Sequence, residues 1–173
     1  MLRRPCRYPY GLPSGSVARM ASTYELYQKV ADQPFGRRFF SAAYMLKVPY
    51  FRSVRPAVLE MAPHRAVVQL RKRRALDNHI GTLHALAIAN GLEAAMGLLA
   101  EATVAPGMRW IPKGIALDYL AKVPGDVRCV AETEPRDWER QAPFQVDVRV
   151  SAHLRDGTVV VRGIIPIWVT ARK

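Results

Sequence analysis

The sequence predicts an α+β fold in which a curved antiparallel sheet wraps around one long helix. The stretch 83–102 is apolar nearly all round when it is placed on a helix, which is typical of a helix buried inside a protein. About six strand-like segments joined by tight turns make up most of the chain around it. The 173 residues, 50% hydrophobic and 23% charged, suffice for one domain with a real core but not for two large domains.

Two shorter helices are expected before the sheet. Ser22-Thr23-Tyr24-Glu25 has the form of a capping box and predicts a helix that ends before Pro34. The segment 35–47 predicts a second helix, which Pro49 ends, and the two helices are expected to form an outer cover. The apolar face of the second helix is expected to comprise Phe39, Phe40, Ala43, Met45 and Leu46.

A change of hydrophobic period towards two marks the sheet. Segments 54–61 and 66–71 predict a hairpin, with a turn between them. Tight turns are expected at Pro124-Gly125 and Asp156-Gly157. The strands expected after the long helix cover 110–123, 127–133, 144–154 and 158–170.

Residues 1–20 differ from the rest in composition, with four Arg, three Pro and no acid. They predict a disordered basic tail before a single domain over 21–173, the alternatives being a targeting segment or a gene start upstream of Met20. The two cysteines have no CxxC spacing, so neither a disulfide scaffold nor a zinc cluster is expected. Such scarce cysteine predicts a reducing compartment, and we expect the protein to be cytoplasmic. No run of ~18 consecutive apolar residues occurs, so no membrane-spanning helix is expected.

The net charge of +12 predicts attraction to anions: nucleic acid, lipid headgroups or a phosphate-bearing small molecule. Aromatic and basic residues are not regularly interleaved, which does not favour a nucleic-acid partner. His79 and His84 are poorly spaced for two ligands on one helical face, so no metal site is expected.

Glu93 lies near the middle of the apolar stretch. A charge in such a helix costs free energy unless it is paired or used. Glu93 is therefore a functional carboxylate, part of a structural ion pair, or a locally exposed residue. Asn90, one turn earlier, could hydrogen-bond Glu93 or serve packing or capping. The segment before the helix offers Asn78 and Thr82 as possible caps, and free N–H groups at the helix start that suit an oxyanion.

The run Asn78-His79-Ile80-Gly81-Thr82-Leu83-His84, with Glu93 nine residues after the last histidine, resembles the signature of hotdog-fold thioesterases of the phenylacetyl-CoA thioesterase type. That signature reads N-x-x-G-x-x-H-G-G followed by an acid. The wider stretch, with 109–114 and 119–120, resembles the DUF4442 branch, over roughly 35–170 of the chain. The resemblance implies a hotdog fold, hydrolysis of an acyl-CoA thioester, a homodimer or homotetramer, and no cofactor.

The resemblance implies a role for each matching residue. Glu93 takes the place of the family's catalytic acid, usually Asp, as general base for water or as nucleophile. Asn78 would position the water or the carboxylate, and His84 would lie beside the thioester. The backbone N–H of Ala85, at the first Gly of the signature, would polarise the carbonyl oxygen, with Gly81 and Thr82 as neighbouring substrate-binding residues.

Two departures from the signature bear on activity. His-Gly-Gly is replaced by His84-Ala85-Leu86, and the acid is Glu. The change from Gly to Ala keeps the backbone amide donor, but the added side chains leave the substrate less room to reach it. This loss of both glycines favours the alternative of a hotdog protein that binds acyl-CoA without cleaving it. The signatures of hotdog hydratases and dehydratases are not found.

The basic run Arg71-Lys72-Arg73-Arg74 precedes Asn78, so Arg73 and Arg74 are candidates to bind coenzyme A phosphates. Arg109 and Lys113 are similar candidates, and the alternative for each is a solvated position. Ala85 and Glu93 are eight residues apart, or ~12 Å along a helix. Because both cannot touch one thioester carbon, a competent site must combine Ala85 of one subunit with Glu93 of another.

Overall fold

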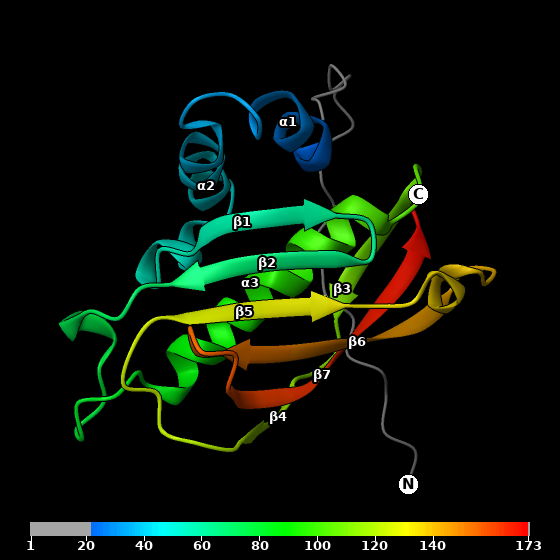
Figure 1. Cartoon of the computed structure of the whole chain (residues 1–173). Coiled ribbons are helices and arrows are strands. Elements are labelled where there is room, and N and C mark those ends of the chain that lie inside the picture. The colour runs from blue at the N-terminus through cyan, green and yellow to red at the C-terminus, as the bar shows by residue number, and fades with distance from the viewer. Residues whose placement is uncertain (1–21, 173) are drawn as a thin grey trace, which may run out of the picture.

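The structure, a computed structural model, describes residues 22–172, so the predicted tail over 1–20 lies outside the described residues. Its strands form one antiparallel sheet in the order β1-β2-β5-β6-β7-β3, with β4 also paired to β7 (Figure 1). The strands are β1 (Ala57–Ala62), β2 (Arg65–Leu70), β3 (Met108–Pro112), β4 (Ala116–Tyr119), β5 (Val127–Glu132), β6 (Phe144–His153) and β7 (Val159–Ala171). The helices are α1 (Thr23–Val30), α2 (Gly36–Lys47) and α3 (Ala85–Thr103), with the short 3-10 helices η1 (Pro49–Ser53), η2 (Arg74–Leu76) and η3 (Pro135–Trp138).

Helix α3 lies against the concave face of the sheet, as Figure 1 shows, and its apolar side chains form much of the core. Gly91 marks a close approach of α3 to the sheet: a Cβ at this position would lie 2.6 Å from Leu70 Cδ1 and 2.9 Å from Cys129 Sγ. A side chain there would require Leu70, Cys129 or the helix to shift. Hence the predicted arrangement of one long helix wrapped by an antiparallel sheet is confirmed.

The length and hydropathy of α3 would also suit a membrane span, and it is the one such helix among the described residues. Burial explains this composition, since 67% of its most apolar window is inside the protein. A core helix wrapped by a sheet needs the same apolar residues as a helix in lipid.

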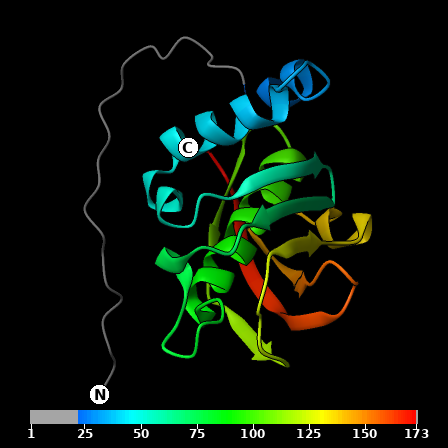
Figure 2. The ribbon, with the colours of Figure 1, turned by 60° about the vertical axis from the view of Figure 1, so that its left-hand side comes forward.

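The two N-terminal helices lie together beyond β1, at one end of the molecule (Figure 2). The predicted capping box is present, because Ser22 Oγ accepts from Glu25 N–H and the Glu25 carboxylate accepts from Ser22 N–H. In α2, Phe40 and Tyr44 are buried, but Phe39 and Leu46 are exposed. The broad apolar face expected of α2 is therefore only partly used: one stripe packs on the sheet and another faces outwards.

An aromatic row joins these helices to the rest of the fold. The rings of Tyr27 and Phe40 meet edge to face with centroids 5.0 Å apart, and Tyr44 continues the row to Phe51, 5.4 Å away, in η1. Glu101, near the end of α3, accepts hydrogen bonds from Thr23 and from Trp110. The cover is therefore fixed to the core by both aromatic packing and a carboxylate.

The strand expected over 110–123 is two strands, β3 and β4, and the sheet has seven strands in place of six. Both strands pair with β7: Pro112 lies opposite Ile167, and Ala116 lies opposite Ile164. The chain therefore advances four residues along the edge while β7 advances three. One extra residue bulges there, after Lys113 N–H has donated to the carbonyl oxygen of Pro166 at 2.8 Å. Together β3 and β4 form one edge of the sheet.

Candidate functional site

Asn78 closes the loop that precedes α3. Its Oδ1 accepts hydrogen bonds from the N–H groups of Ile80 and Thr82, both at 3.1 Å, and its Nδ2 donates to Thr82 Oγ1 at 2.9 Å. Gly81 within this loop has φ of +76°, a left-handed value that favours glycine. Asn78 and Thr82 therefore bind each other, and the expectation that they cap the helix is wrong.

The cap of α3 is His84. Its Nδ1 accepts from Leu86 N–H at 3.1 Å, so in the neutral ring the proton is on Nε2, which can donate to a ligand. The neighbouring N–H of Ala85 has no acceptor among residues 22–172, as expected for the first residue of a helix. This leaves a free amide donor at the positive end of the helix dipole.

Tyr119 fixes the same helix start from the sheet edge. Its hydroxyl donates to the carbonyl oxygen of Ala85 at 3.0 Å. Burial raises the pKa of Tyr119, so the phenol remains a donor. The edge strand β4 and the first turn of α3 thus form one continuous surface.

Glu93 projects from α3 on the side away from the sheet. Consecutive helical residues are about 100° apart, so Glu93 lies nearly opposite Gly91, which faces the sheet. Glu93 is half-buried, and within residues 22–172 its carboxylate makes neither a hydrogen bond nor an ion pair. The structural ion pair considered from the sequence is therefore not formed within the protomer.

The charge of Glu93 acts on the buried hydroxyl of Tyr44 in α2. Burial, together with the negative charges of Glu101 and Glu93, raises the pKa of Tyr44 far above its usual range. The phenol stays protonated and donates to the carbonyl oxygen of Ala94 at 3.3 Å. Glu93 is thus followed directly by the residue of α3 that Tyr44 of α2 contacts, whereas His84, Ala85 and Leu86 at the start of the helix are exposed.

Asn90 is buried one turn before Glu93, with 7% of its surface exposed. Its Nδ2 donates to Ser53 Oγ at 3.4 Å, and its Oδ1 is buried without a hydrogen-bond partner in the described part of the chain. The hydrogen bond to Glu93 that the sequence allowed is not formed. Ser53, which the sequence did not indicate, also accepts from Arg73 through its carbonyl oxygen at 2.6 Å.

The basic run before Asn78 is only partly free. Lys72 pairs with Asp77 at 2.8 Å, and Arg73 binds Ser53 as described above. Arg74 is exposed and makes no ion pair within residues 22–172. Of the two more distant candidates, Arg109 donates to Thr170 and Lys113 lies over the ring of Trp168.

The structure thus gathers Asn78, Gly81, Thr82, His84 and Ala85 at the start of α3, with Arg73 and Arg74 nearby. Glu93 stands apart from them, since eight residues of helix span ~12 Å. Large apolar side chains are exposed in the loop before α3, at its first turn, and on or beside the edge strands β3 and β4. They are Ile80, Leu86, Ile111, Ile115, Tyr119 and Leu120.

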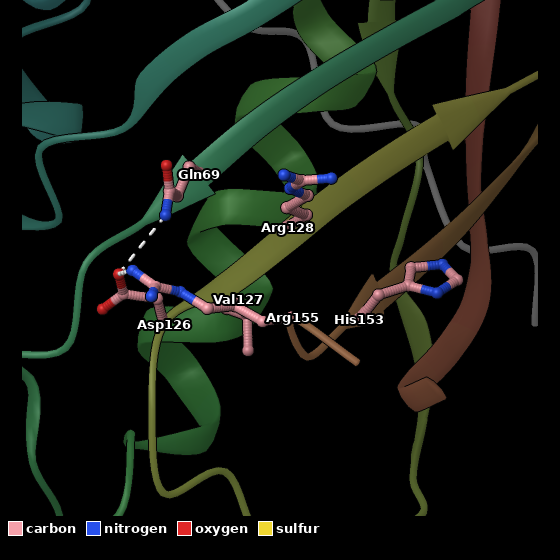
Figure 3. Close-up of a pocket in the computed structure, with 6 residues that line it drawn as sticks. All are labelled: Gln69, Asp126, Val127, Arg128, His153 and Arg155. Carbon is pink, nitrogen blue, oxygen red and sulfur yellow. Dashed lines mark hydrogen bonds and ion pairs between the residues drawn. The ribbon is translucent and has the colours of Figure 1, made fainter. Parts of the chain in front are cut away.

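A pocket of about 460 Å³ lies elsewhere, on the outer face of the sheet (Figure 3). Asp126 is one of its lining residues and accepts from Gln69, from Arg155 and from the backbone N–H of Lys72. These bonds anchor the basic run to β5, which is a structural use of the carboxylate. None of the residues predicted for the site lines this pocket, because the candidate site is an open face in one protomer.

Among residues 22–172, no group of three His, Cys, Asp or Glu side chains is placed to hold a metal ion. The polar groups available at the candidate site are a carboxylate, an imidazole, a carboxamide and a free backbone amide. Such a set can move a proton and stabilise an oxyanion.

The pattern of the family described as "Domain of unknown function (DUF4442)" matches residues 36–169. The chain belongs to the DUF4442 family. This confirms the resemblance seen in the sequence. A search of curated proteins finds no match to this DUF4442 chain.

Several solved structures share the fold of this DUF4442 chain. The genomics target APC5556 is 40% identical, with a TM-score of 0.75, over 87% of this chain and 97% of its own. A thioesterase family protein from Silicibacter pomeroyi is 15% identical, with a TM-score of 0.64, over 76% of this chain and 96% of its own. The thioesterase HI1161 from Haemophilus influenzae is 9% identical, with a TM-score of 0.63, over 88% of this chain and 93% of its own. The hotdog fold is thereby confirmed.

Proposed function

We propose that this protein hydrolyses acyl-CoA thioesters at a site shared by two copies of the chain. The observation that carries the proposal is Glu93: a half-buried carboxylate without a partner on α3, in a protomer whose helix start offers a free amide. The names of the Silicibacter pomeroyi and Haemophilus influenzae proteins support the same reaction class.

The reaction follows from these two groups. Glu93 takes a proton from water as the water oxygen attacks the thioester carbonyl carbon. The carbonyl oxygen gains negative charge opposite the Ala85 N–H, which stabilises it. When the C–S bond breaks, its electron pair leaves with the coenzyme A sulfur, and the proton passes from Glu93 to that sulfur. The products are a carboxylic acid and a free thiol.

Neighbouring residues would orient the reactants. The Nε2–H of His84 can donate to the thioester, because Nδ1 is held by Leu86 N–H. Asn78 keeps the loop with Gly81 and Thr82 in one conformation, which acts on the substrate through loop geometry. Arg74 is the better phosphate ligand of the basic run, since Arg73 is already bound to Ser53.

A second copy would complete the site. The apolar surface beside Ala85 includes Leu86 and the exposed side chains of the edge formed by β3 and β4. Pairing this edge with its own copy would bury that surface and satisfy the unpaired edge. It would also carry Glu93 of one copy toward Ala85 of the other. A cytoplasmic location remains part of the proposal.

Turnover of a panel of acyl-CoA substrates tests the proposal. Glu93→Gln keeps size and removes the base, so kcat should fall by about 10²–10⁴. The matched control is Glu139→Gln, the same change at an exposed position. Equal activity of Glu93→Gln and wild type would contradict the proposal.

The second candidate function is acyl-CoA binding without hydrolysis. It is favoured by Ala85 and Leu86, which replace the two glycines of the signature, and by the exposed Leu86 side chain at the helix start. Tight binding of coenzyme A esters by wild type, with no turnover of any member of the panel, would favour this candidate.

A further inference from the structure

The outward stripe of α2 has no partner in the described fold. It consists of Phe35, Phe39, Ala42 and Leu46, which recur at helical spacing, and Tyr50 continues it in η1. The four large side chains are 75%, 60%, 69% and 71% exposed. We call this set the α2 face. Helix α2, which carries it, lies with α1 at the outer end of the molecule (Figures 1 and 2).

The backbone under the α2 face is held rigidly. Phe40 and Tyr44 fill the opposite side of the helix, and Ser41 Oγ accepts from the Val58 N–H of β1 at 2.9 Å. The exposed side chains therefore stand on a fixed helix. Such a stripe leaves more apolar surface in water than scattered surface residues do.

The segment that carries the α2 face has charges of one sign. The chain has no acid between Asp32 and Glu60. The basic residues of that interval are Arg37, Arg38, Lys47, Arg52 and Arg55. Lys47 pairs with Glu101, and the four arginines make no ion pair within residues 22–172. The complementary surface must be negative as well as apolar.

From this combination we propose that the α2 face docks onto an anionic lipid bilayer. Phe39 and Leu46 would enter the headgroup region, while Arg38, whose guanidinium carbon lies 6.0 Å from the centroid of the Phe35 ring, binds acidic headgroups at its surface. The inference rests on the α2 face alone and does not depend on the proposed thioesterase activity.

Charge distinguishes this occupant from two others. A second copy would set the same arginines against each other, because a twofold interface brings the same patch to both sides. Residues 1–20 carry four Arg and no acid, so they do not supply the opposite charge either. Nucleic acid would meet the charge but leave the apolar stripe uncovered.

Flotation of the full chain with vesicles tests the proposal. Vesicles of phosphatidylcholine with phosphatidylglycerol should retain the protein, and phosphatidylcholine alone should bind it at least about tenfold more weakly. The double variant Phe39→Glu with Leu46→Glu should lose about tenfold or more in retention, and so should Arg37→Glu with Arg38→Glu.

Matched controls separate this surface from general effects. Val159→Glu puts the same charge on an exposed apolar residue of β7, and Arg128→Glu reverses an exposed charge on β5. Both should float like wild type. Equal losses in the controls, no binding to anionic vesicles, or full binding by the Phe39 and Leu46 variant would overturn the proposal. So would a smaller solution mass of that variant in ultracentrifugation, which would assign the face to a second copy.

Discussion

Asn90 reaches Ser53 across the junction of α3 and η1, with Nδ2 donating to the serine hydroxyl at 3.4 Å. The other half of the same carboxamide, Oδ1, is buried and unsatisfied within the described protomer. A buried acceptor without a donor costs free energy, and such groups are often kept because a ligand or water binds them.

Replacing Asn90 should therefore have opposite effects on stability and activity. Asn90→Leu removes the unsatisfied acceptor at similar size, so the free energy of unfolding should rise by about 1 kcal/mol. The same variant should lower turnover of acyl-CoA. Urea denaturation and a thioesterase assay measure the two effects. A variant that is both less stable and fully active would mean that Oδ1 has no ligand-binding role.

His84 combines a structural and a chemical task, and two variants separate them. His84→Ala loses the cap of α3 and should cost about 1 kcal/mol of stability. His84→Asn offers a side-chain oxygen to the Leu86 N–H, so stability should be kept while the Nε2–H donor is lost. If the ring orients the thioester, both variants lose activity. Full activity in His84→Asn would restrict His84 to capping.

Ala85→Pro removes the proposed oxyanion donor with little structural cost. Proline is accepted at the first position of a helix, and the extended backbone of His84, with φ of −66° and ψ of 138°, suits a residue before proline. We expect kcat to fall by about 10²–10³ while the melting temperature changes little. The matched variant Ala85→Gly keeps the N–H and should keep activity. Equal rates for the two variants would exclude this amide as the donor.

Cys129 predicts a pH dependence of stability. Burial raises the pKa of its thiol from about 9 to about 12, because the interior disfavours the thiolate. The folded state then holds the proton more tightly than the unfolded chain. The stabilising contribution is complete below the unfolded value and is lost as pH rises from about 9 towards 12.

Denaturation measured from neutral pH to about pH 10 should therefore show a steeper alkaline loss in wild type than in Cys129→Ala, by about 1 kcal/mol. Tyrosine ionisation affects both proteins alike and cancels in the difference. Parallel curves would show that the thiol is already accessible in the folded state.

Hydrophobic period predicted the long helix, the hairpin and most of the sheet, because buried elements repeat their apolar residues at fixed spacing. The same signal failed at 110–123, where one extra residue between Pro112 and Ala116 divides a single expected strand into β3 and β4. It also failed to separate the two stripes of α2. Phe39 and Phe40 have the same side chain, so the sequence alone does not show which of them is buried. Tertiary packing buries Phe40 and leaves Phe39 exposed.

The sequence pointed to Glu93 as a charge in an apolar helix and to the loop with Asn78 by resemblance, and their roles stay predictions. A run with two possible caps could not show that His84 is the cap. Ser53 was missed because its partner Asn90 is 37 residues away in the chain. A hydrogen bond across that separation has no pattern in the sequence.

The most direct test of a shared site is to mix two inactive variants. Glu93→Gln lacks the base and Ala85→Pro lacks the amide donor, so neither should be active alone. If each site takes Glu93 from one copy and Ala85 from the other, mixed dimers contain one intact site, and refolding the two variants together should recover about a quarter of wild-type activity. A mixture no more active than its parents would contradict the shared site.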